Sequence, residues 1–308
     1  MIHHVYANRS NIGDWLSAKA IQALLAPEPM TEHLCDEPFV AETIDRLSRA
    51  TARDLIVIGG GGLFMDYFAP FWQGFRDIAQ RIPFCIWGVG YCDMKREDSR
   101  PPLQLLEEIA RLSQLCVVRD ELTRGHLRTN AFSTAVACPA ISIVPTHPPG
   151  CGVLHVDALD NVGQENFERM EETGRKVAAE TGRSFHSINN LIPAGSEKAL
   201  STLLGRYQAA DLVLAGRLHG CIIGLAMGRK TLAVSGDHKI ESFMRAAGLG
   251  DWVLDLHEID LLPTRLRELP SQPAAEEFIA KTRREHREIA THLKRLANQL
   301  PTRSRHRG

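Results

Sequence analysis

The sequence predicts two α/β domains, each built on a parallel β-sheet, that face each other across a cleft. Short apolar runs alternate with longer amphipathic stretches along the chain, which is typical of strand–helix–strand units and parallel sheets. A proline-rich stretch separates two halves, and each half opens on a predicted strand. The length of 308 residues suits two domains of about 100–200 residues each. We therefore expect two Rossmann-like domains.

The predicted strands are short apolar runs, several of which end in Gly, Asp, Arg or Asn, as strands entering loops do. They cover residues 2–6, 55–58, 84–87, 115–118, 153–156, 212–214 and 231–234. Helices are predicted where apolar residues recur with helical spacing. They cover residues 14–25, 40–48, 103–112, 167–180, 197–208, 221–227 and 240–247, and a charged amphipathic segment, 275–298, is expected to close the chain as a helix.

The best linker candidate is the segment 139–152, because its prolines block helix and sheet alike. We expect an N-terminal domain over residues 1–145 and a C-terminal domain over 146–308. The second domain would include the closing helix and a locally basic, disordered tail at 303–308. No repeat of fixed period is visible.

Composition excludes several classes of function. The formal net charge of −1 gives no global basic field, so we expect no nucleic-acid partner. The seven cysteines form no CxxC pair and the histidines no HExxH or HxH pair, so we expect no disulfide framework and no metal site. A basic-then-apolar leader and a run of ~20 apolar residues are both missing. We expect a cytoplasmic protein whose membrane contact, if any, is peripheral.

The strongest candidate for chemistry is Arg217-Leu218-His219, which follows a predicted strand and precedes a helix expected to begin near Gly220. Loops at the carboxyl ends of strands are where open α/β sheets bind ligands. Free N–H groups at a helix start favour an anion, and a guanidinium suits carboxylate or phosphate. The same pattern also allows a structural salt bridge for Arg217 and a simple loop hydrogen bond for His219.

Four glycines, residues 59–62, follow the predicted strand 55–58. Glycines let a ligand approach the backbone closely, so Gly60, Gly61 and Gly62 are expected in a ligand-facing loop. Neither the Walker pattern nor the dinucleotide fingerprint is complete here. The alternative is a tight turn in which only one or two glycines matter.

Polar residues occupy other predicted strand-to-helix turns. Asn11 and Asp14 lie in the first of these turns, where either could cap the helix or face the cleft. Arg119 emerges at the same sheet edge as the glycines and could face an anion. Lys239 could neutralise a phosphate or remain a solvated helix-start lysine.

Taken in order, these pieces resemble the polysaccharide pyruvyl transferases. The matching segments are Asn-Ile-Gly-Asp at 11–14, the strand with four glycines at 55–62, Val-Arg-Asp-Glu-Leu at 118–122, the segments 210–219 and 228–234, and Lys239. Together they span roughly residues 8–250. The chain departs from the family pattern at Trp15, where a second acidic residue is common, at Cys138, where Asp is usual, and in the Gly-Asp-His before Lys239.

The resemblance implies a GT-B type fold and phosphoenolpyruvate as the donor substrate, with no further cofactor. The acceptor would be a sugar in a glycan or in a lipid-linked or nucleotide-linked saccharide, bound on the side of the first domain, and the product a pyruvate ketal. Arg217 and His219 would bind the donor and carry out catalysis, with Leu218 and Gly220 beside them. Arg119 and Lys239 would help to hold the donor.

A mechanism can be written for these residues. We expect His219 to be the acid that protonates the methylene carbon of the donor, because a bound anion would raise the pKa of the imidazole. Arg217 would clamp the carboxylate or phosphate. Asp14 is a candidate for the base that deprotonates the sugar hydroxyl.

Two other readings remain. A GT-B glycosyltransferase that uses a nucleotide sugar would bind a diphosphate with the same cleft, basic loop and glycine turn. A non-catalytic glycan-binding or scaffold protein is suggested by Trp15 and Cys138, although the intact Arg217, His219 and Lys239 argue against it. The sequence carries no signal for the oligomeric state.

Overall fold

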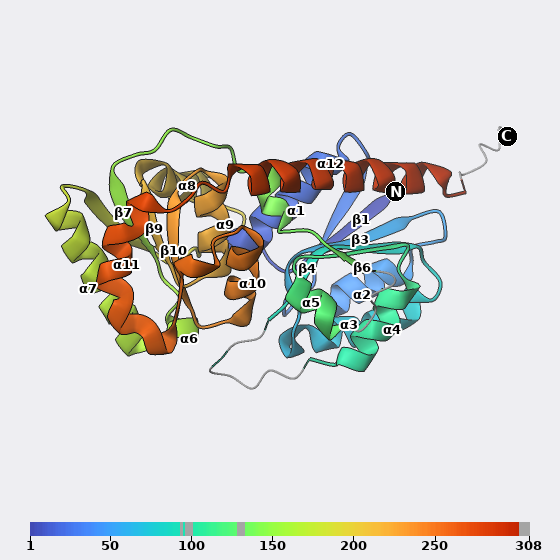
Figure 1. Ribbon diagram of the computed structural model, residues 1–308. Helices are drawn as coiled ribbons and strands as arrows, with labels where there is room; N and C mark the ends of the chain where they lie inside the picture. Colours follow the sequence, from blue (N-terminus) through green and yellow to red (C-terminus); the bar gives the residue numbers. More distant parts are fainter. Residues whose placement is uncertain (93–94, 96–100, 128–132, 302–308) are drawn as a thin grey trace.

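A computed structural model of the protein shows two parallel β-sheets side by side, each covered by helices (Figure 1). The structure describes residues 1–92, 95, 101–127 and 133–301, so the basic tail at 303–308 lies outside the described residues. All the strand pairs of the two sheets are parallel. The predicted fold class, two Rossmann-like parallel-sheet domains with a C-terminal helix, is confirmed.

The first sheet is formed by the N-terminal half of the chain, with the strand order β2-β1-β3-β4-β5-β6. Its strands are β1 (Ile2–Tyr6), β2 (Met30–Leu34), β3 (Leu55–Phe64), β4 (Phe84–Tyr91), β5 (Leu115–Val118) and β6 (Ser133–Ala135). Its helices are α1 (Ile12–Leu25), α2 (Val40–Ser48), α3 (Ala69–Ala79), α4 (Leu103–Leu112) and α5 (Glu121–His126), with the short 3₁₀ turns η1 (Asp66–Phe68) and η2 (Pro139–Ser142).

The second sheet has the order β11-β10-β9-β7-β8. Its strands are β7 (Gly152–Val156), β8 (Ser184–Ile188), β9 (Leu212–Ala215), β10 (Lys230–Ser235) and β11 (Val253–Asp255). The helices of this half are α6 (Leu159–Val162), α7 (Gln164–Glu180), α8 (Glu197–Ala209), α9 (Leu218–Ala226), α10 (His238–Ala246), α11 (Leu262–Glu268) and α12 (Glu276–Gln299), with the 3₁₀ turns η3 (Gly250–Trp252), η4 (Leu256–Leu261) and η5 (Leu269–Ser271).

The predicted linker is in part a core element. Pro139–Ser142 forms the turn η2, in which proline takes the first position, where its missing N–H costs nothing. Ala140 and Ile141 are fully buried and belong to the hydrophobic cluster that fills the second half. The two halves are therefore joined through packed residues at this point.

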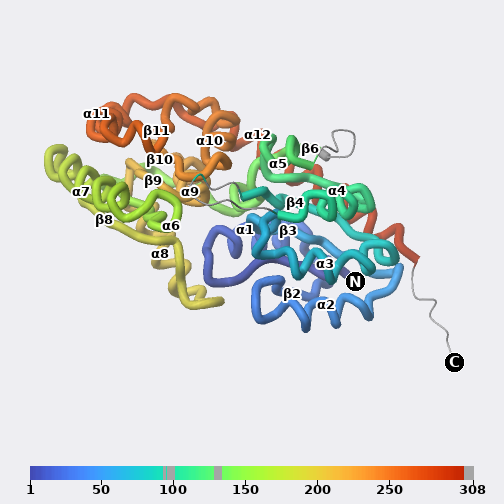
Figure 2. The backbone as a smooth tube through the Cα atoms, turned by 90° about the horizontal axis from the view of Figure 1, so that it is seen from below, coloured from blue at the N-terminus to red at the C-terminus, as the bar shows by residue number. Residues whose placement is uncertain are grey.

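Helix α1 lies between the two halves in both views of the chain (Figure 1, Figure 2). Ile12, Trp15 and Leu16 from its first turns belong to the hydrophobic cluster of the second half. Ile21 and Leu25 from its last turns pack instead with residues of the first sheet. Helix α1 thus packs in the hydrophobic cores of both halves, and this packing fixes the position of its N-terminus relative to both sheets.

Helix α12 returns from the second half to the first (Figure 1). Near its start, Phe278 contacts Phe243 of α10, with ring centroids 5.7 Å apart. Further along, Trp87 Nε1 of β4 donates to His286 Nδ1 at 3.0 Å, and His286 Nε2 lies 2.6 Å from the carbonyl oxygen of Ala137. Burial lowers the pKa of His286 to about 4, so the ring stays neutral and can accept the indole hydrogen bond.

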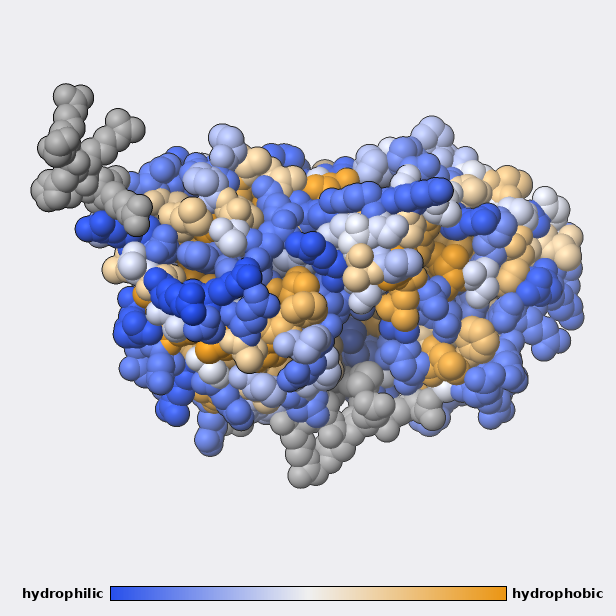
Figure 3. Space-filling model, turned by 180° about the vertical axis from the view of Figure 1, so that it is seen from behind, coloured by the Kyte–Doolittle hydropathy of each residue, from blue (hydrophilic) through white to orange (hydrophobic). Residues whose placement is uncertain are grey.

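One face of the molecule is mainly hydrophilic (Figure 3). Hydrophilic side chains cover most of the face seen from behind, and apolar side chains gather only in small groups (Figure 3). No helix among the described residues has the length and apolar character needed to cross a bilayer.

The packing of α12 predicts a large effect of Leu293→Ala. Leu293 is fully buried with Ile2 and Ile21 of the first half, and removing such a side chain costs about 2–5 kcal/mol of stability. Urea denaturation should detect the loss. Arg295→Ala, at an exposed position on the same helix, should change stability by less than about 0.5 kcal/mol; equal effects of the two variants would contradict the packing described here.

Candidate functional site

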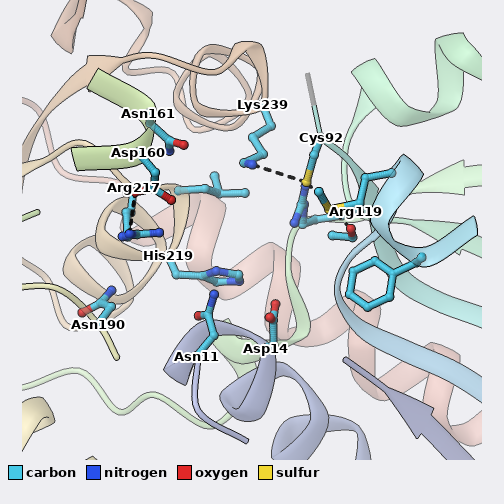
Figure 4. A pocket seen from close by; sticks show the side chains of 14 residues that line it. Asn11, Asp14, Cys92, Arg119, Asp160, Asn161, Asn190, Arg217, His219 and Lys239 are labelled. Atoms are coloured by element: carbon cyan, nitrogen blue, oxygen red, sulfur yellow. Dashed lines mark hydrogen bonds and ion pairs between the residues drawn. The ribbon is translucent and has the colours of Figure 1, made fainter. Parts of the chain in front are cut away.

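A cavity of about 270 Å³ opens between the carboxyl ends of the strands of the two sheets. Residues of both halves line it (Figure 4). The lining residues are Asn11, Asp14, Gly62, Met65, Phe68, Cys92, Arg119, Asp160, Asn161, Asn190, Arg217, Leu218, His219 and Lys239. The position is the one that open α/β sheets use for ligands.

The structure brings most of the predicted site residues together in this cavity. These are Asn11, Asp14, Gly62, Arg119, Arg217, Leu218, His219 and Lys239. Gly60, Gly61 and Gly220 do not line the cavity; they lie in the packing beneath it. It also adds residues that the sequence analysis did not single out: Met65, Phe68, Cys92, Asp160, Asn161 and Asn190.

The glycine run is part of a strand, so its predicted position in a loop is wrong. Strand β3 continues through the run to Phe64 and pairs with β4 as far as Tyr91. Gly60 and Gly61 have φ angles of 99° and 113°, which favour glycine. A Cβ at Gly60 would lie 3.1 Å from the backbone nitrogen of Ala18, and one at Gly61 would lie 2.5 Å from Asp14 Oδ1. These two glycines therefore let helix α1 approach the sheet and place Asp14.

Gly220 has a packing role as well. A Cβ at this position would lie 2.9 Å from the Cβ of Ala215 and 3.0 Å from Val156. The missing side chain lets helix α9 lie close on strands β7 and β9. Helix α9 begins at Leu218, earlier than predicted, so His219 lies in its first turn and Arg217 at its N-cap.

Arg217 is held by the loop after β7 and by helix α6. Its Nε donates to the carbonyl oxygen of Asp157 at 2.8 Å, and its Nη2 forms an ion pair with Asp160 Oδ1 at 2.7 Å. The side chain of Asp160 is 58% exposed, and such pairs contribute little because water screens them. The guanidinium is therefore positioned, yet it can still face a ligand in the cavity.

His219 lies against the first turn of α1. A Cβ at Gly13 would collide with the imidazole ring, so only glycine permits this contact. Cys138 Sγ lies 3.7 Å from His219 Nε2. Burial, together with the positive charges of Arg119, Lys239 and Arg217, lowers the pKa of His219 to about 3. The imidazole is therefore neutral at pH 7.

Asp14 shows the opposite shift. Burial raises its pKa to about 7, although the charges of Arg119, Lys239 and Arg217 act in the other direction. Asn11 accepts a hydrogen bond from Gly13 N at 3.0 Å and is thus the N-cap of α1. The cap leaves Asp14 free for the cavity, where about half of its carboxyl groups hold a proton at neutral pH.

Two further cations reach the cavity from opposite sides. Arg119 is 4% exposed; its Nε donates to Asp120 Oδ2 at 3.2 Å and its Nη2 to the carbonyl oxygen of Tyr91 at 3.2 Å. Lys239 Nζ lies 2.5 Å from Asp237 Oδ2 and 3.4 Å from Cys92 Sγ. The second contact crosses the cleft, because Cys92 follows β4 of the first sheet (Figure 4).

The arrangement is suited to a small anion with more than one charged group. Arg119, Arg217 and Lys239 converge on one cavity, and guanidinium and ammonium groups bind carboxylates and phosphates with charge-assisted hydrogen bonds. Across the described part of the chain, no cluster of His, Cys, Asp or Glu could hold a metal ion.

Four of the six residues that the sequence analysis missed follow strands that it missed or ended too early; Asp160 and Asn161 follow β7, which it did predict. Asn190 follows β8, whose sequence Ser-Phe-His-Ser-Ile has no apolar run, and Cys92 follows the unpredicted end of β4. Asn161 lies in the short helix α6 after β7. A search for polar residues just beyond each predicted strand does not reach Asn190, because β8 was not predicted.

A family model described as polysaccharide pyruvyl transferase matches residues 11–238. The matched segment contains each predicted site residue except Lys239, which follows it directly. No curated protein was found to match the sequence.

Solved structures match the chain over nearly its whole length. The S. aureus MnaA–UDP complex has a TM-score of 0.57 at 9% identity and covers 96% of each chain. The UDP-GlcNAc 2-epimerase of Neisseria meningitidis, bound to UDP-GlcNAc, has a TM-score of 0.56 at 10% identity and covers 95% of this chain and 98% of its own. The glycotransferase of kitacinnamycin has a TM-score of 0.51 at 14% identity and covers 97% and 98%. At such identities the matches show the fold, which is of the GT-B type.

The raised pKa of Asp14 predicts how Asp14→Asn changes stability with pH. Below about pH 4 the carboxyl is protonated in the folded and unfolded protein, and its burial carries no charge penalty. Between pH 4 and 7 the unfolded chain releases this proton while the folded protein keeps it, so folding loses stability as the pH rises. A shift from 3.8 to about 7 corresponds to as much as ~4 kcal/mol.

Asp14→Asn should therefore melt at a higher temperature than the wild type at pH 8, and the difference should shrink toward pH 4. Asp77→Asn, at an exposed position, controls for the change of net charge. A difference in melting temperature that is constant from pH 4 to 8 would contradict the raised pKa.

Proposed function

The chain belongs to the polysaccharide pyruvyl transferase family, and we propose that it transfers the three-carbon unit of phosphoenolpyruvate to two hydroxyls of one sugar. The products are a cyclic pyruvate ketal and inorganic phosphate. The acceptor is a sugar of a glycan or of a lipid-linked or nucleotide-linked precursor. Family membership makes the protein a transferase; the donor and the acceptor are the proposal.

The observation that carries this proposal is the convergence of Arg119, Arg217 and Lys239 on one small cavity. Phosphoenolpyruvate presents a carboxylate and a phosphate on neighbouring atoms, and binding both requires several cations. The volume of about 270 Å³ lies just below the range of roughly 300–1,000 Å³ common for drug-sized ligands. A three-carbon donor suits this small cavity, with the sugar at its open side.

The reaction needs one proton delivered to carbon and two removed from hydroxyls. Protonation of the methylene carbon turns it into a methyl group and makes the central carbon electrophilic. A sugar hydroxyl then forms a C–O bond to the central carbon and loses its proton. Phosphate leaves with the electrons of its bond to that carbon, and a second hydroxyl of the same sugar closes the ketal with loss of another proton.

The pKa shifts support an assignment of the acid and the base that reverses the sequence-based one. At neutral pH about half of the Asp14 carboxyl groups hold a proton, whereas the His219 imidazole is uncharged, because their pKa values move to about 7 and about 3. Two titratable groups whose environments separate their pKa values are suited to opposite roles. We assign Asp14 as the acid that protonates the methylene carbon and the neutral His219 as the base for the sugar hydroxyl. The negative charge of a bound donor raises both pKa values and keeps Asp14 protonated.

The remaining residues bind and orient. Arg217, at the N-cap of α9, and Lys239 would hold the phosphate, and free N–H groups of the first turn of α9 add to the anion site. Arg119 would hold the carboxylate from the side of the first sheet. The donor would thus lie between both halves of the protein.

A binding experiment separates the proposed donor from a nucleotide sugar. Phosphoenolpyruvate should raise the melting temperature of the wild-type protein, because a ligand that binds only the folded state stabilises it. UDP-GlcNAc serves as the comparison. Stabilisation by UDP-GlcNAc alone would favour a nucleotide-sugar enzyme and contradict the proposed donor.

Activity is measured as phosphate release from phosphoenolpyruvate with a panel of sugars, with the mass of each product determined. Asp14→Asn and His219→Ala should each lower kcat by about 10²–10⁴-fold, the range for loss of general acid–base catalysis. For Asp14→Asn the affinity for phosphoenolpyruvate should not fall, because the variant removes a negative charge from an anion site.

Glu197→Gln, at an exposed position on α8, is a matched control and should keep the wild-type rate. Near-normal turnover by Asp14→Asn would remove Asp14 from the mechanism, and near-normal turnover by His219→Ala would do the same for His219.

A further inference from the structure

Asn190 has the most unusual backbone in the wall of the cavity. It follows β8, and with a φ angle of 58° it is the one non-glycine residue of the described chain in the left-handed region. Asparagine tolerates this conformation better than most residues, but a cost in free energy remains. Backbone strain of this kind collects at functional sites, where the surrounding structure holds it in place.

The side chain of Asn190 has one satisfied end and one free end. Tyr207 Oη of helix α8 donates to Asn190 Oδ1 at 2.9 Å, and burial raises the pKa of this tyrosine, so it remains a donor. Asn190 Nδ2 is buried and has no hydrogen-bond partner among the described residues. A buried donor without a partner is costly, and such groups are rare in folded proteins.

The free amide points to a ligand. Asn190 lines the cavity and is 1% exposed, and its amide nitrogen is turned toward Arg217 (Figure 4). An N–H group beside a guanidinium offers two neighbouring donors, which suits an oxygen of a carboxylate or a phosphate.

The backbone around Asn190 is fixed by the other half of the protein. Its carbonyl oxygen accepts from Ile12 N at 3.1 Å, and Ile192 N donates to the carbonyl oxygen of Ser10 at 2.9 Å. Leu191 forms a bridge with Asn11, the cap of α1. The free amide and the first turn of α1 are thus held in fixed relative positions, and Asn190 and Asp14 line the same cavity.

We propose that Asn190 determines the specificity of the site for an anionic donor: its Nδ2 donates a hydrogen bond to a charged oxygen of the donor beside Arg217. The inference rests on the proposed function, since phosphoenolpyruvate supplies that oxygen. Tyr207 is a positioning residue, because its hydroxyl turns the amide so that nitrogen, not oxygen, faces the cavity.

The variant Asn190→Asp tests this most sharply. Aspartate has the same shape, tolerates the left-handed backbone and still accepts from Tyr207. It replaces the free donor by a negatively charged oxygen. At pH 8 we expect the dissociation constant of phosphoenolpyruvate, measured by calorimetry, to rise at least about tenfold.

Asn189→Asp is the matched control. It makes the same change of charge one residue earlier, at an exposed side chain whose Oδ1 accepts from Leu191 N at 3.1 Å, a bond that aspartate keeps. Its affinity for phosphoenolpyruvate should stay within about twofold of the wild type. Equal affinities of the two aspartate variants would overturn the role of Asn190.

A second variant covers the case in which Asn190→Asp does not fold. Asn190→Gly adopts a positive φ without strain and lacks the donor, so it should also bind phosphoenolpyruvate more weakly than the wild type. Wild-type affinity in Asn190→Gly would overturn the proposal.

Inorganic phosphate and UDP are measured alongside as probes. If either binds the wild type while phosphoenolpyruvate does not, the proposed function fails, and the same variants decide the role of Asn190 with that anion. If phosphoenolpyruvate, inorganic phosphate and UDP all fail to bind, both the proposed function and the role of Asn190 are contradicted.

Discussion

The structure depends on the close approach of helix α1 to both sheets. Gly60 and Gly61 remove the side chains that would separate α1 from β3, and Gly13 removes the one that would displace the ring of His219. The approach buries Asp14 beside three cations from both halves. Its raised pKa follows from that burial, since the cations alone would lower it. The same contact thus shapes the cavity and sets the protonation state of its carboxyl group.

Sequence patterns predicted the parts of the fold that are buried on both faces. The central strands β1, β3, β4, β7, β9 and β10 are apolar runs because helices cover them on both sides. Strands β2 and β8 lie at sheet edges and are half exposed, so they have no apolar run to detect. Helix α3 was missed because Pro70 and Gly74 are residues that usually interrupt helices. A proline in the first turn is nevertheless compatible with a helix.

The candidate site was predictable where a residue follows an apolar strand. Arg119, Arg217 and Lys239 follow β5, β9 and β10, and all three line the cavity. The glycine run was wrongly predicted to be a loop, because glycine is equally compatible with a loop and with a strand that a helix approaches closely. The sequence could not predict that the pKa of Asp14 lies above that of His219. This order arises from the burial of both side chains, which exists only when the two halves pack together.

Two of the three departures from the family pattern, Trp15 and Cys138, lie in the packing behind the site. Trp15 is 6% exposed and packs in the cluster that joins α1 to the second half. Cys138 is buried, with Sγ 2.9 Å from Ser17 Oγ and 3.7 Å from His219 Nε2, and burial raises the pKa of its thiol. A neutral thiol behind His219 adds no negative charge, whereas an ionised aspartate there would favour the imidazolium. Cys138 therefore adds no charge that would oppose the neutral state of His219, which burial and the neighbouring cations produce.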